Sequence, residues 1–156
     1  MRRLERNILN GPILREGFIP AAIGSSIYNC GMYSAQVLDH FQHPRNAGEI
    51  ADPDASVQME NPACGDVLKL TLRIMGDRIE EIRFLAQGCV PAMACASLLT
   101  ELMQGKTIAE ARRLRRDELV RAIGGLPKAS LHASHLAIDA LTAAIRNHEA
   151  EIGSGK

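Results

Sequence analysis

The chain has 156 residues, enough for one domain with a hydrophobic core, and its 46% apolar and 23% charged residues are typical of a globular protein. Equal totals of 18 basic and 18 acidic residues give no electrostatic basis for binding nucleic acid or an anionic membrane, and no apolar run is long enough to span a bilayer. Its cysteines (30, 64, 89 and 95) are too few and scattered for a secreted disulfide framework, which favours reduced thiols in a cytoplasmic protein.

Residues 1–31 differ from the rest of the chain. They mix Gly, Pro, Arg and short apolar patches, with no sustained helical or strand period. Glu5, Pro12 and Glu16 interrupt the apolar run that a signal peptide needs, and acidic residues are not typical of transit peptides. We interpret this segment as an irregular N-terminal extension, either disordered or an over-long gene start, because Met32 directly precedes the organised region.

The organised region, residues 32–150, begins with a short helix predicted by SAQVLDHFQHP, in which Ser34 suits the N-cap and Pro44 follows the end. Residues 55–59 fit a strand. Residues 66–87 predict a β-hairpin, because apolar and polar side chains alternate on both sides of a turn at Gly76-Asp77. The hairpin residues expected to share the apolar faces are Leu68, Leu70, Leu72, Ile74, Ile82, Phe84 and Ala86.

After Gly88-Cys89 the period becomes helical, with a helix to Gln104, shorter helices over 107–115 and 117–123, and a last helix from about 130 to 149. The last helix has an apolar stripe of Leu131, Ile138, Leu141 and Ile145. Residues 151–156 are expected to form a flexible tail, and the basic run 112–121 a solvated helix face. Strands followed by a run of helices predict an α+β fold with helices on one sheet face.

Cys64 and Cys89 are the candidate reactive residues. Cys64 lies in a turn sequence, NPACGD, and Cys89 lies where the second hairpin strand ends and a helix begins. A helix N-terminus favours a thiolate, and an antiparallel hairpin brings its two corners together. This favours metal ligands or nucleophiles over buried structural cysteines, whereas mid-helix Cys95 is expected to be structural and Cys30 has no evident partner.

The local sequence around the histidines does not by itself indicate a functional site. On a helical wheel His132 and His135 lie with Asp139 and Arg146, away from the apolar stripe, which predicts surface positions. His40 and His43 are equally unremarkable in their local sequence.

Several motifs in order give the chain a family resemblance from about Met32 to Glu149. They are YSAQVLDHFQHPRNAG (33–48), NPACGD (61–66), GC (88–89) before a small-residue helix ending in LLTELMQGK, and LHASHLAIDAL (131–141). The chain thereby resembles the U-type scaffold proteins of iron–sulfur cluster assembly, the IscU/NifU N-terminal domain family. The resemblance implies a SufE/NifU-like α+β fold, with a three-stranded antiparallel sheet and helices packed on one face.

The same resemblance implies a non-enzymatic role at a site of three cysteines, an aspartate and a histidine. A cysteine desulfurase delivers sulfur there, iron is added, and a transient [2Fe–2S] cluster passes to acceptor proteins. By position, Cys64 and Cys89 match the first two cysteines, Asp66 the aspartate and His132 the histidine. Ala133 replaces the third cysteine, which in this family looks like the sulfur acceptor.

Cys64, Asp66, Cys89 and His132 still provide four donors, a set that suits a labile cluster, a single ferrous ion or zinc. Three hypotheses stay open: a scaffold or carrier; a homologue with a mononuclear zinc or iron site that acts as a desulfurase adaptor; and a zinc-dependent sulfurtransferase. The loop 126–130 reads Leu-Pro-Lys-Ala-Ser where chaperone-served members have Leu-Pro-Pro-Val-Lys, which puts an Hsp70-type chaperone in doubt as a partner.

Overall fold

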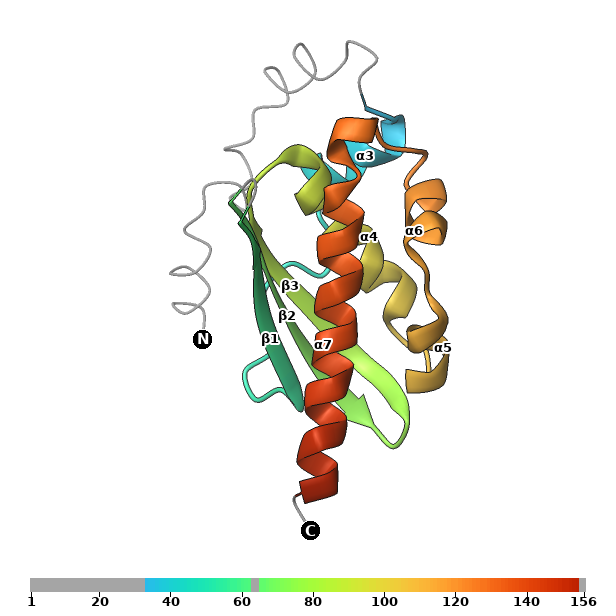
Figure 1. The fold of residues 1–156 in the computed structure, drawn as a ribbon. Helices are drawn as coiled ribbons and strands as arrows, with labels where there is room; N and C mark the ends of the chain where they lie inside the picture. The colour runs from blue at the N-terminus through green and yellow to red at the C-terminus, as the bar shows by residue number, and fades with distance from the viewer. Residues whose placement is uncertain (1–32, 63–64, 155–156) are drawn as a thin grey trace.

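The computed structural model describes residues 33–62 and 65–154 (Figure 1). The extension predicted over residues 1–31 lies outside this range. The described elements are α3 (Ala35–Gln42), β1 (Ala55–Asn61), β2 (Asp66–Met75), β3 (Arg78–Gln87), α4 (Val90–Met103), α5 (Ile108–Arg113), α6 (Arg116–Ala122), a 3₁₀ helix (Lys128–Ser130) and α7 (His132–Ser154).

The three strands form one antiparallel sheet in the order β1-β2-β3, as predicted. Leu70 of β2 pairs with Val57 on one side and with Phe84 on the other. The tight turn between β2 and β3 contains Gly76, whose φ of 68° lies in the left-handed region that glycine adopts without steric cost.

The helices cover one face of this sheet, which confirms the predicted α+β architecture (Figure 1). α7 packs on β1 and β2, and α4 packs on β3 and against α7. Ile74 is half-buried, and the other residues predicted to line the apolar faces of the hairpin are all buried: Leu68, Leu70, Leu72, Ile82, Phe84 and Ala86. Burial of these apolar side chains between sheet and helices supplies the main stabilisation of the fold.

The opposite face of the sheet is partly covered by the segment that precedes β1. Thr71 points away from the helices but is only 1% exposed, and its Oγ1 accepts a hydrogen bond from the Ile50 N–H at 3.1 Å. Lys69 on the same face forms an ion pair with Glu49. Alternation along the strand predicts which face a side chain lies on, but it does not reveal a covering segment that is distant in sequence.

The last helix differs from its prediction at both ends. It begins at His132, after the separate 3₁₀ helix, so Leu131 precedes it and is 36% exposed instead of joining the apolar stripe. It continues to Ser154, so residues 151–154 of the predicted flexible tail are helical. Alanine and glutamate favour helix, and no proline stops the chain in this stretch.

The basic run 112–121 is an ion-paired surface, in agreement with the predicted solvated face. Arg116 pairs with Asp139, and Arg121 pairs with Asp117. Arg112 reaches Glu149 on α7. In the described part of the chain, no helix has both the length and the apolar character needed to cross a membrane.

Candidate metal centre

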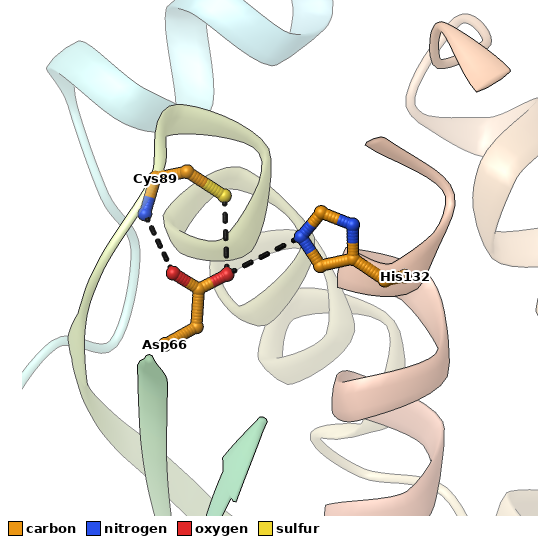
Figure 2. Close-up of side chains that lie close together, drawn as sticks. All are labelled: Asp66, Cys89 and His132. Carbon is orange, nitrogen blue, oxygen red and sulfur yellow. Dashed lines mark hydrogen bonds and ion pairs between the residues drawn. The ribbon is translucent and has the colours of Figure 1, made fainter. Parts of the chain in front are cut away.

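Three side chains from separate elements meet at one end of the sheet (Figure 2). Asp66 is the first residue of β2, Cys89 is the N-cap of α4, and His132 is the first residue of α7. Because β2 and β3 are antiparallel, with Val67 opposite Gln87, the start of β2 lies beside the junction that leads into α4. One carboxylate oxygen, the thiol sulfur and one ring nitrogen all lie within 4.8 Å of one another.

Asp66 is the central residue of this cluster and is only 2% exposed. Its Oδ1 accepts a hydrogen bond from the backbone N–H of Cys89 at 3.1 Å, and its Oδ2 accepts one from the Cys89 thiol at 3.2 Å. The carboxylate lies at the N-terminus of α4, where the helix dipole favours negative charge. Asp66 therefore holds Cys89 through both its backbone and its side chain.

His132 presents one ring nitrogen to this pair. Its Nδ1 lies 3.1 Å from the carbonyl oxygen of Ala129, and since a carbonyl oxygen only accepts, Nδ1 carries the proton of this bond. In the neutral ring the lone pair is then on Nε2, which lies 3.5 Å from Oδ2 of Asp66. This Nε2 is buried and has no hydrogen-bond partner among the residues that the structure describes.

The donor set and its spacing fit a thiophilic metal ion. A thiolate, an imidazole nitrogen and a carboxylate oxygen are ligands that both zinc and iron accept. Bonds of about 2.0–2.3 Å in a tetrahedral site separate neighbouring donors by about 3.3–3.8 Å. The distances from Asp66 Oδ2 to the Cys89 sulfur and to His132 Nε2, 3.2 and 3.5 Å, are close to that range. Histidines that bind metals commonly donate the other ring N–H to a backbone carbonyl, and Nδ1 of His132 makes this kind of bond to Ala129.

Cys64 lies outside the described residues. Ala133, where the family resemblance leads us to expect a third cysteine, is in the first turn of α7 and is 1% exposed. Cys95 does not replace that cysteine: it is fully buried in α4, and burial, with a further contribution from Cys89, raises the pKa of its thiol to about 12.

The remaining histidines lie outside the cluster. His135 is exposed, as predicted. His40 is buried, although nothing in its local sequence indicated this. Its Nδ1 lies 2.8 Å from Ser97 Oγ, and its Nε2 lies 3.4 Å from Glu101. Burial, together with the charge of Arg45, lowers the pKa of His40 below its ordinary value. Its burial depends on packing between α3 and α4, which the sequence of α3 alone does not reveal.

Sequence reasoning missed two contributors to the site. The Ala129 carbonyl could not have been found, because every residue type offers the same backbone oxygen. For Gly88 the sequence does offer an indication, because a glycine directly precedes a cysteine at a strand-to-helix junction. Its closeness to Asp66, however, depends on the folded geometry.

Comparison with known proteins identifies the family. The family described as NifU-like N terminal domain matches residues 32–154. The iron-sulfur cluster assembly scaffold protein IscU 1 of Archaeoglobus fulgidus is 48% identical over 114 residues, which cover 73% of this chain and 74% of that one. The IscU scaffold protein of Azotobacter vinelandii is 38% identical over 125 residues, which cover 78% of this chain and 97% of that one.

A solved structure supports the same fold. The N-terminal part of a nitrogen-fixing NifU-like protein from Brucella abortus superposes with a TM-score of 0.63, covering 77% of this chain and 96% of that one. At 19% identity this likeness concerns the fold alone. From the family match, the relatives' identities and the shared fold, the chain belongs to the NifU-like N-terminal domain family.

Proposed function

We propose that this protein is an iron–sulfur cluster assembly scaffold or carrier, which binds iron or a transient [2Fe–2S] cluster and passes it to acceptor proteins. The observation that carries the proposal is the convergence of Asp66, Cys89 and His132, with the buried Nε2 of His132 directed at the pair. Relatives at 48% and 38% identity are named as IscU scaffold proteins, which favours this function over a zinc-only adaptor.

The proposed ligands are Cys64, Asp66, Cys89 and His132. Cys64 enters from the sequence motif, since it lies two residues before Asp66. Thiolates suit iron and sulfide best, so replacing two of four thiolates by a carboxylate and an imidazole loosens the hold on a cluster. A mixed donor set therefore suits a cluster that is cargo and must leave for an acceptor.

The proposed role is not enzymatic, because the protein holds a cargo while other proteins supply sulfur and accept the product. The proposed partners are a cysteine desulfurase and iron–sulfur acceptor proteins, whereas the divergent loop 126–130 gives no support for an Hsp70-type chaperone. The cysteine pattern supports a cytoplasmic location. With Ala133 in place of the third cysteine, incoming sulfur would be carried as a persulfide on Cys64 or Cys89.

Anaerobic reconstitution with Fe²⁺, cysteine, a cysteine desulfurase and dithiothreitol, which reduces the transferred sulfur to sulfide, tests this function, with visible absorption and metal analysis as readouts. We expect a coloured protein that contains iron and sulfide and loses its colour to an apo-ferredoxin. His135→Ala is a matched control, because His135 is exposed three residues from His132 on the same helix. A colourless protein that retains one tightly bound zinc ion would contradict the proposal and favour the mononuclear adaptor.

A further inference from the structure

Gly88 occupies the single position between the end of β3 at Gln87 and the helix cap Cys89. Its φ of 148° is a conformation that residues with a side chain rarely adopt. Gly88 therefore permits the sharp change of direction by which the chain leaves the sheet and starts α4. The surroundings of this glycine show a second requirement.

A Cβ atom at position 88 would collide with the carboxylate of Asp66. It would lie 2.2 Å from Oδ1, 2.7 Å from Cγ and 3.0 Å from Cβ of Asp66. The collision involves the base of the side chain as well as its tip, so a small rotation of the carboxylate does not relieve it. Asp66 is 2% exposed and bonded to Cys89 through both oxygens, so it occupies the space that a side chain at position 88 would need.

Other described glycines with a positive φ do not share this feature. Gly65, Gly76, Gly105 and Gly125 have open space where a Cβ would lie. Gly124 lies close to Ser34 and Gln36, outside the metal centre. Among the glycines in the described ranges, Gly88 alone has a candidate metal ligand in the space of the missing side chain.

We propose that Gly88 is a positioning residue for the metal centre: the absence of a side chain at position 88 admits the Asp66 carboxylate to its place beside Cys89. This inference rests on the proposed metal-binding function of the same site. A side chain at position 88 displaces the carboxylate from Cys89 and leaves the thiol and the His132 imidazole. The Gly88→Ala protein then binds metal as if Asp66 were absent.

Anaerobic Co²⁺ titration of the full chain tests the proposal, because the visible bands of Co²⁺ report its ligand set. The proteins are wild type, Gly88→Ala, Asp66→Ala and the double variant. We expect Gly88→Ala to weaken Co²⁺ binding about 10–100-fold and to shift the visible bands as Asp66→Ala does. The double variant should be no weaker than either single variant, since both changes remove the same ligand.

Gly105→Ala is the matched control, with a φ of 89° at the parent glycine and no atom within 4 Å of the added Cβ. It introduces backbone strain without touching the metal centre, so its Co²⁺ spectrum should equal that of wild type. If the wild-type protein does not bind Co²⁺, the proposed metal-binding function is refuted. A Gly88→Ala protein with the wild-type spectrum, alongside an altered Asp66→Ala spectrum, refutes the role of Gly88 alone.

A metal-free measurement covers the case in which Gly88→Ala folds poorly. Removing the Asp66 carboxylate takes away the atoms at 2.2 and 2.7 Å, so Asp66→Ala should recover part of the stability that Gly88→Ala loses. Urea unfolding of the four apo-proteins, followed by circular dichroism, measures this coupling. If the loss in free energy of unfolding of the double variant equals the sum of the losses of the two single variants, the proposed steric relationship is overturned.

Discussion

Nε2 of His132 lies 3.5 Å from Oδ2 of Asp66, although the two residues belong to different elements and are distant in the sequence. The Ala129 carbonyl fixes the opposite side of the imidazole ring. Nε2 is buried and makes no hydrogen bond within residues 33–62 and 65–154. The contact with Asp66 is longer than a well-formed hydrogen bond, so a metal ion bound between the two side chains would satisfy the buried Nε2 better than the carboxylate alone does.

Replacement of His132 tests its role as a ligand. We expect His132→Ala to weaken binding of Zn²⁺ or Fe²⁺ by about 10-fold or more, since loss of a ligand costs at least as much as loss of a group that only orients a ligand. Anaerobic competition with a chromogenic chelator measures the affinity. His135→Ala, three residues along α7 and exposed, should bind as wild type does. Equal losses in the two variants would argue that neither imidazole is a ligand.

Restoration of the missing thiol tests the effect of Ala133. This residue is 1% exposed in the first turn of α7, directly after His132. We expect Ala133→Cys to assemble a cluster in the desulfurase-driven reaction about tenfold faster than wild type, because a third thiolate accepts sulfur and binds iron. Visible absorption against time provides the rates. Equal rates would show that Cys64 and Cys89 suffice as thiolates.

The burial of Cys95 predicts selective alkylation. With a pKa of about 12 against an ordinary value of 9.0, its thiolate fraction at mildly alkaline pH is lower by about 10³. We expect iodoacetamide to label Cys89 in the folded apo-protein and to label Cys95 only after denaturation, as measured by peptide mass spectrometry. Prompt labelling of Cys95 in the folded protein would place it outside the core.

His40 predicts a pH dependence of stability. Burial and Arg45 lower its pKa from 6.5, while the nearby carboxylates of Glu101 and Asp39 act in the opposite direction. The unfolded chain therefore binds more protons than the native protein as the pH falls through and below 6.5, so the contribution of His40 to stability is present above that pH and is lost below it.

Urea unfolding at several pH values measures this effect. We expect the free energy of unfolding of the wild type to fall more steeply than that of His40→Gln between about pH 7 and pH 5. The glutamine amide keeps a polar group near Ser97 and Glu101 but does not titrate in this range. Parallel pH profiles for the two proteins would assign the dependence to other groups.

Removal of residues 1–31 tests whether the extension contributes to the site. The family match covers residues 32–154, and the three described donors all lie within it. We expect a chain that starts at Met32 to bind Zn²⁺ within about twofold of the full chain, as measured by the same chelator competition. A marked loss of affinity would show that the extension takes part in the metal centre.

Sequence patterns predicted most of the fold because its elements are strongly periodic. Alternation over residues 66–87 predicted the hairpin, and the glycine and proline signals placed the helix that follows it. Antiparallel pairing then brought Asp66 and Cys89 to one corner of the sheet. His132 was different: its helical position indicated a surface residue, and only the family resemblance marked it as a ligand.

The sequence by itself determined the types of donor that are available and the strand and helix pattern, and its family resemblance places Ala133 where a third cysteine is expected. The tertiary structure decided which atoms meet: Nε2 of His132 against Asp66, the burial of His40, and the space at Gly88 that Asp66 fills. The reason is physical. Periodicity reports the buried face of one element, whereas a metal centre depends on ångström-scale distances between atoms of segments that are far apart in the chain.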